Sequence, residues 1–291
     1  GSGSVTFDKT SPTAAITYSY AAPYKNGGAN VTITATFNGA VLDSPTPTIA
    51  IAGSGIANVS SADMSKTSTT VYTYTYAVPT GDGTGTVTVG TGTDAAGNVV
   101  TSTPTSGATF TVDNTVPTAA ITYSYAAPYK NGGANVTITA TFNGAVLDSP
   151  TPTIAIAGSG IANVSSADMS KTSTTVYTYT YAVPTGDGTG TVTVGTGTDA
   201  AGNVVTSTPT SGATFTVDNT VPTLSSVSIE SNNSTTTLAK VSDVVTLTFT
   251  ANETIGTPVV TFQSGSAAIT DNSITYVNTS GNIWTAAYTA N

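Results

Sequence analysis

The stretch Val31-Thr-Ile-Thr-Ala-Thr-Phe37 decides the fold class of this chain. Apolar residues occupy every second position, and threonine fills the positions between them. This period of two is typical of a β-strand that buries one face. The same seven letters return as Val136-Thr-Ile-Thr-Ala-Thr-Phe142, and a looser version, Val245-Thr-Leu-Thr248, follows further along. The sequence therefore predicts β-structure in three places at comparable positions.

The stretch belongs to a long internal repeat. Residues 12–116 recur letter for letter as residues 117–221, a period of 105. A unit of roughly 100 residues can bury a core of its own, so each copy is expected to fold as one domain. The predicted organisation is a trailing strand of a preceding repeat, or a tag, plus linker at 1–11, two identical repeats at 12–116 and 117–221, and a divergent, incomplete domain at 222–291.

Short alternating segments fill each copy, and turn-forming Gly, Pro, Asn and Asp separate them. In the first copy the pattern predicts strands at about 13–20, 30–37, 47–52, 70–78, 84–92, 98–102 and 107–113. Seven short strands at this spacing favour an all-β fold, with tandem immunoglobulin-like antiparallel β-sandwich domains. Val31 and Ile33 should then face the core, and Val87 and Val89 should meet them from the same sheet.

Tyrosines form a second alternating row. Tyr72, Tyr74 and Tyr76 share one face of a predicted strand, and Tyr18 and Tyr20 alternate in the same way. A cross-strand core ladder is the favoured interpretation, because aromatic residues on one face of a strand usually pack inward. A platform on which sugar rings stack is the alternative.

The composition excludes several functional classes. Only 7% of the residues are charged, with six lysines, no arginine and fifteen acidic residues, and the net charge is −9. Nucleic acid is therefore not expected as a partner. The chain has no histidine and no cysteine, so it lacks Ser-His-Asp and Cys-His sites, and we expect no enzyme. No stretch approaches the roughly 20 apolar residues of a membrane span.

The connection between the copies is short. Asp113-Asn-Thr-Val-Pro117 leads from the last predicted strand of one copy to the first strand of the next. Proline restricts both itself and the residue before it to extended backbone. We therefore expect neighbouring repeats to be close partners in an elongated, semi-rigid rod.

Acidic residues occupy loops that the predicted strand order brings to one end of the sandwich. Asp8 lies in the leading linker, Asp43 in the loop after the second strand, and Asp94 and Asn98 in the Asp-Ala-Ala-Gly-Asn loop. Carboxylates within about 6 Å repel by about 1–3 kcal/mol per pair, and oxygen ligands suit Ca²⁺. The equivalent candidates further on are Asp113, Asp148, Asp199 and Asn203, then Asp218 and Glu253. The alternative is that Asp94 and Asn98 only form a turn and that the linker aspartates are solvated.

Three of these segments together carry a resemblance. Asp94-Ala-Ala-Gly-Asn98, Phe110-Thr-Val-Asp-Asn-Thr-Val-Pro-Thr118 and Val31–Phe37 are similar to the bacterial Ig-like tandem-repeat domains of giant surface adhesins. The resemblance implies an extender stalk at a prokaryotic cell surface, outside the cell, with Ca²⁺ at domain junctions. One position departs from it: relatives have an acidic residue shortly after the Thr-x-Thr-Phe strand, where this chain has Gly39 and Gly144, and only the third domain has Glu253.

The leading hypothesis is therefore a structural stalk that separates a binding domain from the cell. Two alternatives remain open. One is a subunit of an extracellular filament, in which other copies of the chain complete the unfinished third domain by donor-strand exchange. The other is a module that binds carbohydrate or a host surface through tyrosine rows or loop tips.

Overall fold

The computed structural model describes residues 3–269 and 273–291 and divides the chain into two compact units. Unit 1 comprises Gly1–Asp218 and contains both copies of the repeat, and unit 2 comprises Asn219–Asn291. Within the described residues every regular element is a β-strand. None of them is a helix of the length and apolarity that crossing a bilayer requires.

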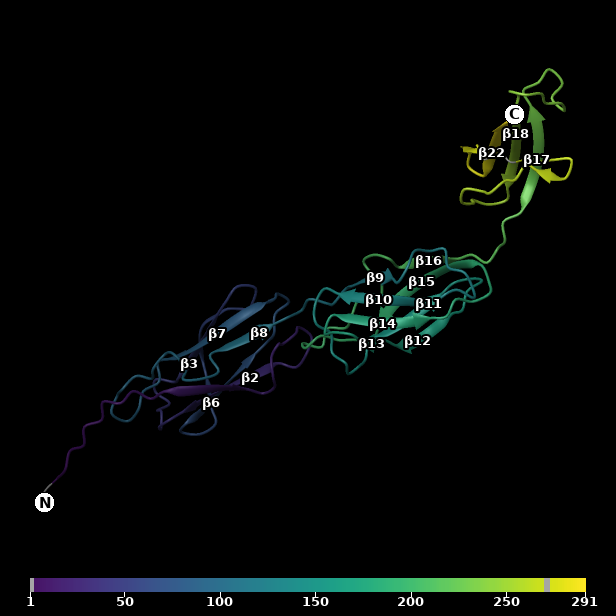
Figure 1. The fold of residues 1–291 in the computed structure, drawn as a ribbon. Coiled ribbons are helices and arrows are strands. Elements are labelled where there is room, and N and C mark those ends of the chain that lie inside the picture. Colours follow the sequence, from purple (N-terminus) through teal and green to yellow (C-terminus); the bar gives the residue numbers. More distant parts are fainter. Residues whose placement is uncertain (1–2, 270–272) are drawn as a thin grey trace. The chain divides into compact units, whose positions relative to one another are not determined.

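Repeat 1 is a sandwich of two four-stranded antiparallel sheets (Figure 1). One sheet has the order β1-β2-β6-β5 and the other the order β4-β3-β7-β8. The strands are β1 (Ala14–Tyr18), β2 (Val31–Phe37), β3 (Thr48–Ala52), β4 (Val59–Asp63), β5 (Ser65–Lys66), β6 (Val71–Tyr76), β7 (Gly83–Gly90) and β8 (Thr109–Val112). The predicted all-β, immunoglobulin-like sandwich architecture is confirmed.

Repeat 2 forms the same sandwich, with sheets β9-β10-β14-β13 and β12-β11-β15-β16. Its strands are β9 (Ala119–Tyr123), β10 (Val136–Phe142), β11 (Thr153–Ala157), β12 (Val164–Asp168), β13 (Ser170–Lys171), β14 (Val176–Tyr181), β15 (Gly188–Gly195) and β16 (Thr214–Val217). Identical sequence has produced identical pairing, which makes the two copies internal controls for each other.

The inward residues of the two sheets form the core of each repeat. Val31 and Ile33 on β2 are fully buried, as the alternation predicts. Val87 and Val89 are also buried, but their strand β7 pairs with β3 in the opposite sheet. The prediction of a shared sheet was wrong, because local alternation determines which face a strand buries and leaves its pairing partner open.

Two further segments differ from the prediction. Residues 98–102 form no strand; they make one bridge, Thr93 with Val99, and the backbone then bonds elsewhere. Edge strands β4 and β5 were missed, because most of their residues are exposed and they lack an apolar alternation.

The tyrosine rows are largely core. Tyr72 and Tyr76 are fully buried, and the ring of Tyr76 meets that of Phe110 at 5.3 Å in an edge contact. Tyr74 and Tyr18 are half-buried against the same cluster, and Tyr20 is 38% exposed. Burial of Tyr72 and Tyr76 leaves no continuous tyrosine face for stacking of sugar rings.

The beginning and the end of each repeat are joined by parallel bridges in addition to the antiparallel sheets. Ala15 is bridged to Ser106 and Tyr24 to Val112, both in the parallel sense. The equivalents in repeat 2 are Ala120 with Ser211 and Tyr129 with Val217.

Unit 2 contains one four-stranded sheet of the order β17-β18-β22-β21, which repeats the order β1-β2-β6-β5. Its strands are β17 (Leu224–Ser231), β18 (Val244–Ala251), β21 (Thr275–Ser280) and β22 (Ile283–Thr289), with a small hairpin of β19 (Gln263–Ser264) and β20 (Ala267–Ala268). Phe262 and Tyr288 pack on this sheet, while Val227 and Ile229 remain exposed. Residues 219–269 and 273–291 form no second four-stranded sheet against it.

Candidate functional site: the linker socket

The Asp94–Asn98 loop of repeat 1 is a closed turn held by its own aspartate. Asp94 Oδ1 accepts hydrogen bonds from the N–H groups of Ala96 and Asn98, both at 2.9 Å. The side-chain amide of Asn98 donates to Asp94 Oδ2 at 2.8 Å. Gly97 adopts a φ of +91°, a conformation in which a side chain would be strained. We call this loop, and its copy Asp199–Asn203, the linker socket.

The electrostatics of the loop follow from these bonds. Donation by the Asn98 side chain, together with the N–H groups of Asn98 and Ala96, holds the pKa of the Asp94 carboxyl below its usual value despite its burial. The carboxylate form is therefore the form that keeps the loop closed.

The socket also binds the linker that precedes its repeat. In repeat 1, Asn98 Nδ2 donates to the main-chain carbonyl of Asp8 at 3.2 Å. In repeat 2, Asn203 Nδ2 makes the same bond to the carbonyl of Asp113 at 2.9 Å, and also reaches Asp199 Oδ2 at 2.9 Å. The socket thus recognises a main-chain carbonyl of the linker rather than its side chain.

Burial differs between the two sockets although their sequences are identical. Asn203 is buried, with 7% of its surface exposed, whereas Asn98 is only half-buried. Gly202 is half-buried and Gly97 exposed. Since the letters are the same, repeat 1 must supply the cover of the second socket.

One lysine provides part of that cover. Lys25 Nζ donates to the carbonyl of Gly202 at 2.5 Å, which links the far end of repeat 1 to the socket of repeat 2. Lys25 is half-buried, while its copy Lys130 is exposed. Lys25 and Ala201 also line a common pocket of about 310 Å³ with Tyr20 and Pro23.

The linker itself is anchored to repeat 1. The Asn114 side chain donates to the carbonyls of Gly81 at 2.8 Å and Pro79 at 3.2 Å, and its oxygen accepts the N–H of Asn26 at 2.6 Å. Asp82 accepts the Asn114 N–H at 2.5 Å. We call Asn26, Asp82, Asn114 and Thr115 the linker clasp.

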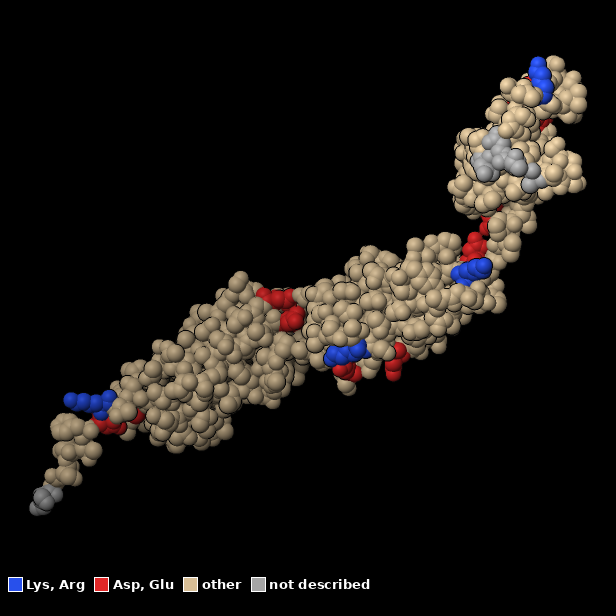
Figure 2. Space-filling model, viewed as in Figure 1, with Lys and Arg blue, Asp and Glu red and all other residues tan. Residues whose placement is uncertain are grey.

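Asp82 holds the clasp together through its charge. Its Oδ2 accepts the hydroxyl of Thr115 at 2.5 Å. This bond, followed by the bond from the Asn114 N–H, lowers the pKa of Asp82. The three residues Asp113–Thr115 are thus held from both sides, by the clasp of repeat 1 and the socket of repeat 2. Figure 2 shows acidic side chains gathered between the two repeats of unit 1 and few charges elsewhere on the face drawn.

The predicted grouping of acids holds only in part. Asp8 and Asp94 line one pocket of about 540 Å³, together with Asn38 and Gly39. The loop that carries Asp43 does lie at this end, since Leu42 N–H donates to the Thr93 carbonyl at 2.8 Å.

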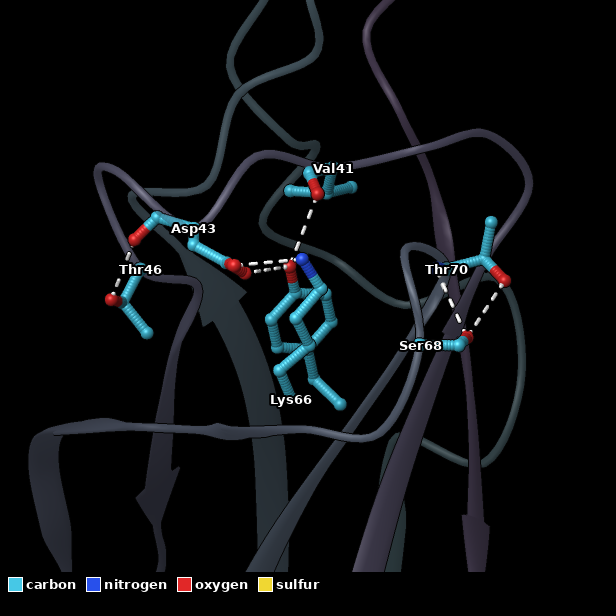
Figure 3. Close-up of polar contacts among 7 residues, drawn as sticks. Val41, Asp43, Thr46, Lys66, Ser68 and Thr70 are labelled. Carbon is cyan, nitrogen blue, oxygen red and sulfur yellow. Dashed lines mark hydrogen bonds and ion pairs between the residues drawn. The ribbon is translucent and has the colours of Figure 1, made fainter.

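The Asp43 side chain, however, belongs to another network (Figure 3). Its Oδ2 contacts Lys66 Nζ at 2.7 Å, and its Oδ1 accepts the hydroxyl of Tyr72 at 2.8 Å. These bonds, first from Lys66 and then from Tyr72, lower the pKa of Asp43. Asp148 makes the same contacts with Lys171 and Tyr177 in repeat 2. The expectation that Asp43 and Asp148 join the linker aspartates was wrong, because an ammonium and a buried phenol hold them.

The remaining candidates are not grouped with them. Asp218 ends unit 1, and Glu253 lies in unit 2 just after β18, half-buried. The part of the chain that the structure describes contains no cluster of three or more His, Cys, Asp or Glu side chains able to hold a metal ion.

The donor set of the socket fits calcium poorly. Ca²⁺ takes six to eight oxygens, with several carboxylates in the tighter sites. Here Asp94 already accepts three hydrogen bonds, and Asn98 turns its NH₂ group toward the linker carbonyl. The third carboxylate is lacking because Gly39 stands in the pocket where relatives have an acid. Calcium binding at the junctions therefore stays a prediction.

Sequence reasoning missed the clasp. Asp82 and Asn26 were interpreted only as turn residues, and Asn114 only as part of the linker. A usable signal was available, since Asn and Asp in turns commonly bond nearby backbone, and Asn114 directly precedes Thr115-Val-Pro.

Comparisons with known proteins identify no family. No family model matches the chain, and no curated protein matches it. Solved structures with a similar fold include the Escherichia coli adhesin FdeC, at 14% identity and a TM-score of 0.42, with 95% of this chain and 87% of that chain covered. A marsupial T cell receptor (10% identity, TM-score 0.35, 95% and 92% covered) and the I9-I11 tandem of titin (9%, 0.31, 94% and 89%) are similar at a lower level.

Proposed function

We propose that the chain is a structural extender: tandem domains that act as a semi-rigid stalk of a prokaryotic surface adhesin or fibre, outside the cell. The observation that carries this proposal is the linker Asp113–Thr115, which both flanking repeats hold through the clasp and the socket. A flexible tether would leave its linker solvated. Neighbouring repeats of the same chain are thus the principal partners.

The stiffness of such a joint comes from the loss of backbone freedom. Fixing the backbone of a residue costs about 1–2 kcal/mol, and net hydrogen bonds contribute about 1 kcal/mol each. The clasp and the socket supply enough bonds to offset that cost for three linker residues. The fixed φ of Pro117 restricts the next position.

Distance measurement across the joint tests this proposal. The chain has no cysteine, so Thr36→Cys and Thr141→Cys place unique spin labels on the exposed faces of the two repeats. We expect a narrow distance distribution, which Asn203→Ala broadens by removing the bond to the Asp113 carbonyl. Asn98→Ala is the matched control, because it makes the same change in a socket that does not face another repeat. Equal widths for both variants would contradict the held joint.

The spacer role has a separate test. Deleting residues 117–221 removes one full period and leaves a Val116-Pro222 seam that matches the original Val116-Pro117. With a tag displayed at one end of the chain, the deletion should lower the maximum particle dimension in solution scattering and bring the tag closer to the supporting surface. A stalk function fails if the dimension is unchanged while both shortened and full chains remain monomeric.

One observation favours the filament alternative. Val5 and Phe7 are 81% and 84% exposed, whereas Phe110 and Val112, which they match in the alignment of repeats, are buried. An apolar, extended segment of this kind suits insertion into another copy. Polymer formation by the full chain, abolished by deleting residues 1–11, would support this function over a plain stalk.

A further inference from the structure

The two ends of each repeat are bonded to each other through the main chain. We call residues 12–24 the leading segment and residues 101–113 the closing segment. Five hydrogen bonds join them: Thr101 N to Pro12 O (2.8 Å), Thr105 N to Ala14 O (2.7 Å), Ile16 N to Ser106 O (3.0 Å), Tyr24 N to Thr111 O (2.9 Å) and Asp113 N to Tyr24 O (2.8 Å). Repeat 2 repeats the same five at positions 105 higher.

The direction of this pairing matters more than its number of bonds. The bridges of Ala15 to Ser106 and of Tyr24 to Val112 are parallel, so both segments run the same way along the sandwich. The chain therefore enters the repeat at the start of one segment and leaves it at the end of the other. These points lie at opposite ends of the bonded pair.

A pull on the chain ends loads such a pair in shear. The leading segment is drawn one way and the closing segment the other, along the strand direction. All five bonds lie across that movement and must yield together. In an antiparallel hairpin pulled at its two open ends, the bonds break one after another.

The bonds are also shielded from water. Ile16, Tyr24, Phe110 and Val112 lie within or beside the paired segments and are all buried. Rings of Tyr24 and Phe110 are 5.7 Å apart, so the two segments meet through side chains as well as backbone. Shielding limits the replacement of a strained bond by a bond to water.

We infer that the leading and closing segments form a mechanical clamp, which makes each repeat resist extension when force is applied along the chain. This inference rests on the proposed stalk function for its purpose, since a stalk that carries an adhesive tip is under tension. It adds that the repeats withstand force as well as span distance. Unit 2 has no such parallel bridges among residues 219–269 and 273–291, so it should extend first.

The clamp is tested by removing one of its bonds in one repeat only. Thr105 is exposed, and Thr105→Pro deletes the N–H that donates to Ala14. Thr67→Pro is the control: Thr67 is also exposed, and its N–H donates to Val71 at 2.8 Å in the β5–β6 hairpin, which the pull does not load. Repeat 2 remains unchanged in both chains and serves as the reference.

The readout is the unfolding rate of single full-length chains at constant force. In the original chain the two identical repeats give equal extension steps with one rate. Thr105→Pro should make one of the two steps about fivefold faster, equivalent to about 1 kcal/mol, because the lost bond no longer resists the transition. Thr67→Pro should leave both rates within about twofold, although it lowers equilibrium stability by a similar amount. Equal acceleration by the two variants would overturn the clamp.

A second measurement needs no weakened bond and remains valid if Thr105→Pro fails to fold. Cysteines at Thr10 and Thr103, both exposed, place handles at the same end of the parallel pair. Pulling on these handles peels the segments apart, so repeat 1 should open at clearly lower force than it does when the chain ends are pulled. Equal forces in the two geometries would show that the segments are not a clamp.

These results are separable from the stalk proposal. A failed clamp with a narrow distance distribution across the joint leaves a spacer that bears little force. A loose joint with an intact clamp leaves force-resistant domains on a flexible string.

Discussion

The two linker sockets have the same sequence and different surroundings. Asp94–Asn98 contacts only the preceding linker, whereas Asp199–Asn203 also receives Lys25 and is more deeply buried. Burial of Asn203 is therefore a property of the assembled joint and not of the loop. A sequence-identical pair of this kind separates what a loop does for its own repeat from what it does for the neighbour.

The Asp43–Lys66–Tyr72 network provides the opposite case. Its copy, Asp148 with Lys171 and Tyr177, makes contacts of the same lengths. Equal surroundings should give equal mutational effects, and unequal surroundings unequal effects. The predictions below test this rule from the largest expected change to the smallest.

Removing the tyrosine hydroxyl should cost the same in either copy. Tyr72→Phe leaves the Val41 carbonyl and Asp43 Oδ1 without their donor, and Tyr177→Phe does so for Val146 and Asp148. We expect a loss of about 1–3 kcal/mol in the free energy of unfolding for each variant. Chemical denaturation of the two full chains should give values that agree, and a clear difference would contradict the rule.

The same hydroxyls set an alkaline limit. Burial, with the hydrogen bond to Asp43 as the second cause, raises the pKa of Tyr72 to about 12 from the usual 10. The folded state then holds a proton that the unfolded state releases above pH 10. Stability should be complete below pH 10 and fall between about pH 10 and 12. Thermal unfolding across this range should show a shallower fall for the chain carrying both Phe substitutions.

Asparagine removal should separate the two sockets. Asn203→Ala deletes a buried amide that serves both Asp199 and the Asp113 carbonyl, whereas Asn98 lies nearer to solvent, which can replace it. We expect Asn203→Ala to cost about 1 kcal/mol more than Asn98→Ala. Comparison of the two chains by thermal unfolding tests this difference, and equal costs would place the role of Asn203 within its own loop.

The lysine pair should show a smaller contrast. Lys25→Met removes the bond to the Gly202 carbonyl but retains an apolar stem, and we expect a loss of about 0.5 kcal/mol. Lys130→Met should change stability by less than that, because Lys130 is exposed. Hydrogen exchange at Gly202 and Asn203 should rise in the first variant alone. An equal rise in the second would remove Lys25 from the joint.

Calcium should have the smallest effect on the original chain. With two carboxylates at a socket, a dissociation constant of about 1 mM gives about 0.4 kcal/mol of stabilisation at 1 mM Ca²⁺. Gly39→Asp adds a third carboxylate to the pocket of Asp8 and Asp94, where an added Cβ meets no atom within 4 Å. Calorimetric titration should show clearly tighter binding for this variant. No heat from either chain would end the calcium hypothesis for this site.

Much of the fold was predictable because the core strands alternate strictly. Every second residue of Val31–Phe37 is buried, as the pattern indicates. Edge strand β4 was not predictable in this way, because its exposed serines carry no alternation. The sheet to which Val87 belongs depends on pairing with Ile51, a distant residue, and local periodicity holds no information about it.

The candidate site was predictable as a location more than as a chemistry. The sequence brought Asp8, Asp94 and Asn98 to one end, and the structure places all three there. It did not show that the Asn98 amide would bond to a carbonyl, or that Lys66 would hold Asp43. Such choices depend on side-chain directions, which spacing along the chain does not specify.

The socket bonds to a carbonyl, a group that every residue carries. A joint recognised in this way tolerates substitution at the linker aspartate and accepts any additional copy that ends in the same backbone geometry. Unequal recombination between the two identical 105-residue segments would therefore yield a gene with one repeat fewer or one more, and each new junction would already be complete. The length of the parent protein can thus vary within a population while its joints stay the same.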